Sequence, residues 1–138
     1  MSVDRVFLDA NILFSVAYGS PGLERLWERA QKGLCELFAS RYVVEVAQRN
    51  LKYPDQVNKL KSYLANVQIV LEAAPNLSCP IDLPGKDRPV FMAAVFARAD
   101  YLITGDMIHF GKYFGRTVSG VKICTARDYL HSSRPIHK

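Results

Sequence analysis

The sequence has few cysteines and no long hydrophobic run. Its 138 residues include three cysteines, an odd number, and no two of them have the spacing of a metal-binding pair. We therefore expect reduced thiols and neither a disulfide framework nor a zinc cluster. Every apolar run is shorter than the roughly 20 residues that cross a bilayer. The N-terminal residues also lack the pattern of a signal peptide, so we expect a cytoplasmic protein without a membrane partner.

The composition is that of a globular protein with an excess of positive charge. Hydrophobic residues make up 49% of the chain, charged residues 22%, and the formal net charge is +5. We predict a single domain over residues 1–131 and a C-terminal tail over residues 132–138. A basic chain attracts polyanions such as RNA or DNA, and this signal gains weight only if the chain also gathers carboxylates in one place.

Short apolar runs alternate with amphipathic segments along the chain. The predicted strands are residues 3–8, 34–39, 68–72, 101–104 and 121–124. The predicted helices are residues 11–18, 21–32, 41–51, 55–67, 88–98 and 126–131. This alternation is typical of a parallel sheet covered on both faces. The predicted fold is therefore α/β, with three αβα layers around a central parallel five-stranded sheet.

Four acidic residues are predicted to meet at one edge of that sheet. In a parallel α/β sheet the strands end and the helices begin at the same edge, where ligands bind. Asp9 and Asp106 each follow a strand, and Asp87 precedes a helix. Glu45 lies in the second turn of its helix, about 7 Å along at ~1.5 Å per residue, within reach of the edge.

Carboxylates that crowd together repel one another, so their pKa values rise or a cation neutralises them. An all-oxygen ligand set suits Mg²⁺ or Mn²⁺. Such a cluster can hold one or two ions and promote the attack of water on a phosphodiester. The pattern thus indicates phosphodiester hydrolysis.

Each acid also has a simpler interpretation. Asp9 and Asp87 could merely cap helices, because aspartate is among the preferred N-cap residues. Glu45 could be a solvated helix residue, and Asp106 could be an ordinary turn residue. The functional interpretation depends on their joint placement.

Several motifs resemble those of the PIN-domain family. Residues 6–13, a strand followed by Asp-Ala-Asn and two aliphatic residues, look like the start of a PIN domain. Residues 86–90, with the alanines at 93–94, and residues 99–106 resemble the third and fourth acidic motifs of the family. Together they are similar to the VapC-type toxins of toxin–antitoxin pairs, over nearly the whole chain.

The resemblance implies a PIN-like fold, an Mg²⁺- or Mn²⁺-dependent endoribonuclease activity, an antitoxin partner and a homodimer. It implies that the catalytic residues and metal ligands are Asp9, Glu45, Asp87 and Asp106. Asn11 and Thr104 would then donate the hydrogen bonds that orient these carboxylates. Glu45 is the weakest match, because only its position in a helix supports it.

One departure from the family concerns residues 107–110, which provide no further acid. A single ion therefore fits the sequence better than two. His109 could contact a phosphate or the leaving group, or be a surface residue.

Basic residues near the predicted edge could hold RNA phosphates, although each could equally be a solvated surface residue. These residues are Lys86, Arg88, Lys112 and Arg116.

Three other functions fit less well. A catalytically silent PIN-like module that binds RNA or protein would be expected to have lost acids. A phosphatase with an aspartate nucleophile generally needs a second acid two residues on, where this chain has Asn11. A structure-specific DNA nuclease usually carries added domains. We therefore predict an endoribonuclease, and the silent module is the main alternative.

Overall fold

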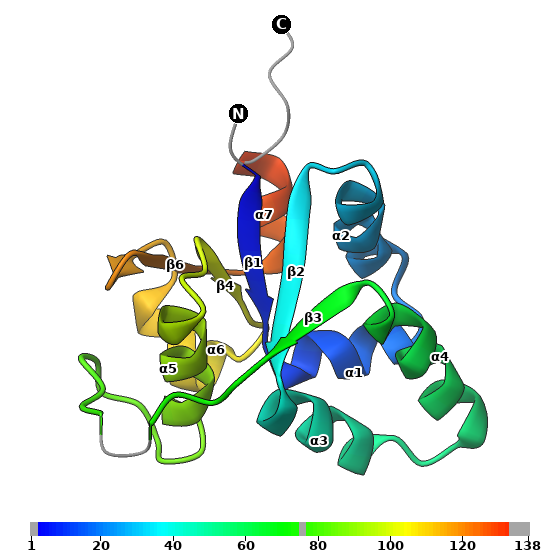
Figure 1. The fold of residues 1–138 in the computed structure, drawn as a ribbon, viewed down its shortest axis with the longest axis horizontal. Coiled ribbons are helices and arrows are strands. Elements are labelled where there is room, and N and C mark those ends of the chain that lie inside the picture. The colour runs from blue at the N-terminus through cyan, green and yellow to red at the C-terminus, as the bar shows by residue number, and fades with distance from the viewer. Residues whose placement is uncertain (1–2, 75–76, 133–138) are drawn as a thin grey trace, which may run out of the picture.

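The computed structural model describes residues 3–74 and 77–132, which form a six-stranded sheet flanked by helices (Figure 1). The strand order is β3-β2-β1-β4-β6-β5. The strands are β1 (Asp4–Leu8), β2 (Cys35–Ser40), β3 (Val67–Val70), β4 (Tyr101–Ile103), β5 (Thr117–Val118) and β6 (Val121–Cys124). The predicted α/β architecture is confirmed.

The centre of the sheet is parallel and fully buried. Strand β1 pairs in parallel with β2 on one side and with β4 on the other. Its last three residues, Val6, Phe7 and Leu8, have no exposed surface, as a strand covered on both faces requires. Leu8 is in register with Ile103, so β1 and β4 end side by side.

The prediction of five parallel strands is wrong in two respects. The sheet has six strands, and the strand at one edge is antiparallel to its neighbour. Strand β5 is a two-residue strand that pairs antiparallel with β6. Ser119 and Gly120 connect them, and both have positive φ, 52° and 82°. Two positive φ values in a two-residue loop are typical of a tight hairpin. The Ser-Gly pair signals this turn in the sequence, but a strand of two residues is too short to give an alternating pattern.

The helices begin where the sequence places capping residues. They are α1 (Ala10–Tyr18), α2 (Pro21–Gln31), α3 (Arg41–Asn50), α4 (Pro54–Leu64), α5 (Arg88–Phe96), α6 (Met107–Phe110) and α7 (Ala126–Ser132), with a 3-10 turn, η1, at Gly111–Tyr113. Ser20 and Ser40 cap α2 and α3 by accepting hydrogen bonds from the backbone N–H groups of Leu23 and Val43, both at 3.3 Å. The short helix α6 and the turn η1 were not predicted, because four-residue helices show no periodicity.

The three cysteines, Cys35, Cys79 and Cys124, are free. Cys35 and Cys124 are buried, and burial raises the pKa of the Cys124 thiol to about 11. These two thiols therefore pack as small apolar side chains.

Among residues 3–74 and 77–132, no helix is both long enough and apolar enough to span a membrane. The division into a domain at 1–131 and a tail at 132–138 stays a prediction, because residues 133–138 lie outside the described residues.

Candidate active site

Asp9 is buried at the junction between β1 and α1. Only 5% of its surface is exposed, and its backbone N–H donates to the carbonyl of Ile103 at 3.0 Å. One carboxylate oxygen, Oδ1, accepts a hydrogen bond from the N–H of Ala10 at 2.7 Å and caps α1. The other, Oδ2, accepts a hydrogen bond of 2.7 Å from the hydroxyl of Thr104. Capping is thus part of what this aspartate does, but it engages only one of its two oxygens.

Thr104 and Asn11 join the end of β1 to the loop after β4. The Thr104 hydroxyl, which is fully buried, also accepts from the side-chain amide of Asn11 at 3.3 Å and from the N–H of Asp106 at 3.1 Å. The carbonyl of the Asn11 side chain accepts from the N–H of Gly105 at 2.8 Å. These bonds fix Asp9 and Asp106 relative to each other, which is the orienting role predicted for Asn11 and Thr104.

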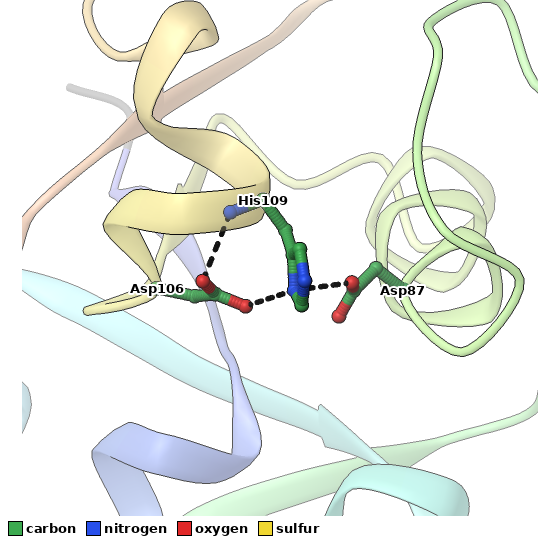
Figure 2. A group of neighbouring side chains, drawn as sticks. All are labelled: Asp87, Asp106 and His109. Atoms are coloured by element: carbon green, nitrogen blue, oxygen red, sulfur yellow. Dashed lines mark hydrogen bonds and ion pairs between the residues drawn. The ribbon is translucent and has the colours of Figure 1, made fainter.

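Asp106 caps α6 and faces an imidazole. Its Oδ1 accepts from the backbone N–H of His109 at 3.0 Å, and its Oδ2 lies 2.8 Å from the ring Nδ1 of His109. The same Nδ1 lies 3.0 Å from Oδ2 of Asp87. Figure 2 shows the imidazole standing between the two carboxylates.

Asp87 lies just before α5 and is only 7% exposed. Its backbone has helical angles and its side chain makes no cap hydrogen bond, so the simple capping interpretation does not hold for this residue. Its Oδ2 is buried and has no hydrogen-bond partner among the described residues.

The environment shifts the pKa values of the three aspartates in different directions. Burial is the largest influence on Asp9 and raises its pKa, and the charges of Asp87 and Asp106 add to this against hydrogen bonds from Thr104 and Ala10. Burial likewise raises the pKa of Asp87, against the opposing charge of His109. Burial also disfavours ionised Asp106, but its hydrogen bonds from His109 outweigh this and lower its pKa. The folded structure therefore disfavours the ionised form of two of the three carboxylates, Asp9 and Asp87.

The three aspartates line one hollow of about 390 Å³. Its other lining residues come from α1, α3, α5 and the loop before α5: Ala10, Asn11, Phe14, Tyr42, Val43, Val46, Asn50, Lys86 and Val90. The Tyr42 hydroxyl donates to the backbone carbonyl of Lys86 at 3.1 Å and so ties α3 to the loop that carries Asp87.

The structure does not bring Glu45 to the other acids, which corrects the prediction that four acids meet. Glu45 is exposed and is not among the residues that line the hollow. The residues of α3 that do line it, Tyr42, Val43, Val46 and Asn50, follow helical spacing and exclude position 45. An apolar valine and an amide thus stand on the wall where a fourth carboxylate was predicted.

The predicted RNA-binding residues lie at different distances from the hollow. Lys86 lines it, whereas Arg88 and Lys112 line a neighbouring depression together with His109. Arg88 also donates to the carbonyl of Leu83 at 2.9 Å. Arg116 is exposed and its guanidinium carbon lies 5.7 Å from the centre of the Tyr113 ring, at the start of β5.

Comparison with known proteins adds a structural relative. No family model and no curated protein matches this sequence. Among solved structures, a chain of VapBC2 from Rickettsia felis, crystallised bound to a DNA fragment from its promoter, is similar with a TM-score of 0.64. The match covers 88% of this chain and 98% of that chain at 15% identity. The fold is PIN-like.

Within this PIN-like fold, sequence reasoning found three of the acids and the residues that orient them. It missed Tyr42 and Asn50, which line the hollow, and the position of His109 between two carboxylates. The spacing of Asp106 and His109, three residues apart, is a signal for the latter, because such residues are neighbours on a helix. This spacing could not be interpreted from the sequence, because helix α6 was not predicted.

Proposed function

We propose that this protein is a metal-dependent endoribonuclease that hydrolyses RNA phosphodiester bonds. The observation that carries the proposal is the meeting of Asp9, Asp87 and Asp106 in one hollow, with Asp9 and Asp87 more than nine-tenths buried. Carboxylates that are buried close together are stabilised either by protonation or by a bound cation. The donor set also fits one, because Oδ2 of Asp87 is buried without a hydrogen-bond partner among the described residues.

The residues present fit Mg²⁺ or Mn²⁺, with Asp87 and Asp106 as holding residues and Asp9 in the same hollow. When bound, such an ion lowers the pKa of an attacking water and neutralises charge on the phosphate. The chain's own part is to orient these carboxylates through Asn11 and Thr104. Lys86, at the rim, would attract the RNA phosphate next to the acids.

We further propose that the protein acts in the cytoplasm as the toxin of a toxin–antitoxin pair and forms a homodimer. The structural similarity to a chain of VapBC2 supports the toxin–antitoxin part of this proposal. Tyr18 and Phe96, which are 54% and 59% exposed, provide apolar surface for a protein partner. Light scattering of the purified chain should give twice the mass of the 138-residue chain, and a monomer mass at micromolar concentration would contradict the dimer.

The test of the nuclease proposal is cleavage of RNA by purified protein with Mn²⁺. We expect the wild type to cut and Asp9→Asn to lose cleavage while keeping its helical circular dichroism. Asp55→Asn, a change of an exposed acid on α4, is the matched control and should cut like the wild type. Equal cleavage by Asp9→Asn would indicate a contaminating nuclease or another site.

A second candidate function, a catalytically silent PIN-like module that binds RNA or protein, is favoured by one observation. The wall of the hollow carries Val46 and Asn50 where a fourth acid was predicted. RNA that is retained with no metal-dependent turnover would identify the silent module.

A further inference from the structure

The imidazole of His109 lies in direct contact with two carboxylates of the candidate site. Its Nδ1 is 2.8 Å from Oδ2 of Asp106 and 3.0 Å from Oδ2 of Asp87. The three residues form a group of potential metal ligands whose ligand atoms all lie within 4.8 Å of one another. Figure 2 shows the two carboxylates on either side of the ring, each joined to it by a dashed line.

One ring nitrogen cannot satisfy both carboxylates. Nδ1 carries at most one proton, so it can donate a hydrogen bond to only one of the two oxygens. The interaction with Asp106 is the hydrogen bond, whereas Oδ2 of Asp87 has no such partner among the described residues although it is buried. A buried carboxylate oxygen without a donor is costly. This oxygen therefore has room for a further partner, and a cation would supply one.

Two of the three distances between these ligand atoms match those between neighbouring ligands of one ion. Two ligands at 90° on an ion that binds them at about 2.1 Å are about 3 Å apart. The two contacts of Nδ1, at 2.8 and 3.0 Å, have this length. The third pair, the two carboxylate oxygens, lies within 4.8 Å, which is close enough for one ion to be shared by all three residues.

The N-terminal cap of α6 does not use the Asp106 oxygen that faces His109. Asp106 caps the helix with Oδ1, through the N–H of His109, and directs Oδ2 at the ring. Capping and coordination thus use different oxygens of one carboxylate. His109 is three residues further along, on the same side of the helix, and is half-buried.

We propose that Nδ1 of His109 is a direct ligand of the catalytic cation and completes, with Asp87 and Asp106, a site of two carboxylates and one imidazole. This inference rests on the metal-dependent function proposed above. His109 takes the place in the ligand set that was predicted for Glu45, which is exposed outside the hollow. In this site the proton of the neutral imidazole resides on Nε2.

An imidazole ligand changes which ions the site prefers. Nitrogen ligands suit first-row transition metals, whereas Mg²⁺ favours oxygen ligands alone. The site should therefore bind Mn²⁺ more tightly than Mg²⁺, and loss of the imidazole should reduce this preference.

The experiment is pulsed electron paramagnetic resonance of Mn²⁺ bound to the full chain without RNA. Electron spin echo modulation detects ¹⁴N nuclei that are bonded to Mn²⁺. We expect ¹⁴N modulation in the wild type and in a double variant, His131→Ala with His137→Ala, which removes the other two histidines. We expect none in His109→Ala, with Mn²⁺ affinity lower by roughly tenfold to a hundredfold and Mg²⁺ affinity changed less.

The outcomes separate this inference from the proposed function. Mn²⁺ that binds to the wild type without ¹⁴N modulation would overturn the ligand role of His109 and leave the metal-dependent function standing. His109 would then be a positioning residue that orients Asp106. Wild-type protein that binds no Mn²⁺ would overturn both. The wild-type spectrum is decisive by itself, so the inference stays testable if His109→Ala fails to fold.

Discussion

The three aspartates of the hollow differ in how their environments treat a negative charge. Asp9 and Asp87 are buried and have raised pKa values, while hydrogen bonds lower the pKa of Asp106. A residue whose charge is disfavoured in the folded state lowers stability wherever it is ionised. Asp9 and Asp87 are therefore expected to lower the stability of the metal-free protein, and the cation that we propose would offset this cost.

This difference predicts how the stability of the metal-free protein depends on pH. The ordinary pKa of an aspartate is 3.8, and the folded values of Asp9 and Asp87 lie above it. Between 3.8 and those raised values the folded protein holds more protons than the unfolded chain, so the free energy of unfolding falls as pH rises. Each unit of elevation corresponds to about 1.4 kcal/mol. Urea titrations in EDTA at a series of pH values measure this slope.

The control is the double variant Asp9→Asn with Asp87→Asn, which should flatten the slope in the same window. Asp106 contributes only below pH 3.8, because its pKa is lowered. In that range the free energy of unfolding falls as the solution becomes more acidic. An unchanged slope in the double variant would assign the effect to other groups.

A second prediction concerns Thr104, which donates to Asp9 and accepts from Asn11 and Asp106. Thr104→Val keeps the shape but leaves these partners unsatisfied in a buried place. We expect the free energy of unfolding to fall by about 1–3 kcal/mol and Mn²⁺ affinity by roughly tenfold to a hundredfold. Thr104→Ser, which keeps the hydroxyl, should retain most of both. Chemical denaturation and calorimetric titration with Mn²⁺ provide the two readouts, and equal behaviour of the valine and serine variants would contradict the orienting role.

At the scale of elements, the site is built from places where strands end and helices begin. Asp9 and Asp106 are both N-caps, of α1 and α6, and each follows the carboxyl end of a buried strand. Parallel pairing of β1 with β4 brings these two ends together. An N-cap residue must present an oxygen at the helix start, so a capping aspartate is held rigidly at the sheet edge.

The third prediction concerns α3. The face of this helix that lines the hollow includes Val46 but not Glu45. Glu45→Gln should therefore leave RNA cleavage within about twofold of the wild type, as changes of exposed residues usually have small effects. Val46→Glu should place a fourth carboxylate in the hollow and raise Mg²⁺ affinity, on the order of tenfold, since charge count tunes the affinity of such sites.

Both variants are compared by cleavage assays and by Mg²⁺ titration at constant ionic strength. A loss of cleavage in Glu45→Gln of a hundredfold or more would restore the prediction that Glu45 is a ligand. A Val46→Glu variant that stays folded but has unchanged Mg²⁺ affinity would show that position 46 does not face the ion.

At the scale of the whole molecule, a basic chain surrounds an acidic hollow. The net charge is +5, while the three aspartates lie together at one edge of the sheet. The net positive charge favours the approach of polyanions such as RNA, whereas the negative charge of the three aspartates repels a phosphate that comes close. Lys86 is exposed and lines the hollow, so its positive charge could hold a phosphate next to the aspartates.

The fourth prediction is that RNA binding depends on salt and partly on Lys86. In EDTA, which prevents cleavage, Lys86→Ala should weaken binding of single-stranded RNAs of different sequence to a similar extent. The slope of log affinity against log salt should fall by about 0.7, the value for one phosphate contact on a single strand. Lys59→Ala, an exposed change on α4, is the control and should leave the slope unchanged. A Lys86→Ala slope equal to that of the wild type would remove Lys86 from the RNA-binding surface.

The sequence by itself determined the order of the longer strands and helices, but not the short elements β5, α6 and η1. Runs such as Val6-Phe7-Leu8 are apolar enough to identify a buried strand. Serine, proline, aspartate or threonine marks the start of the helices that follow the strands. Because parallel strands share a carboxyl edge, the convergence of Asp9, Asp87 and Asp106 followed from these local signals alone.

Only the tertiary structure decided which side chains face the hollow. Successive residues of a helix point about 100° apart, so the position of Glu45 along α3 could be predicted but its direction depends on how α3 packs against α1 and α5. The same holds for His109, whose contact with Asp87 joins α6 to the loop before α5 across a long separation in the chain. Local sequence fixes where an element begins, whereas packing between elements fixes its rotation, and rotation determines which residues meet at the site.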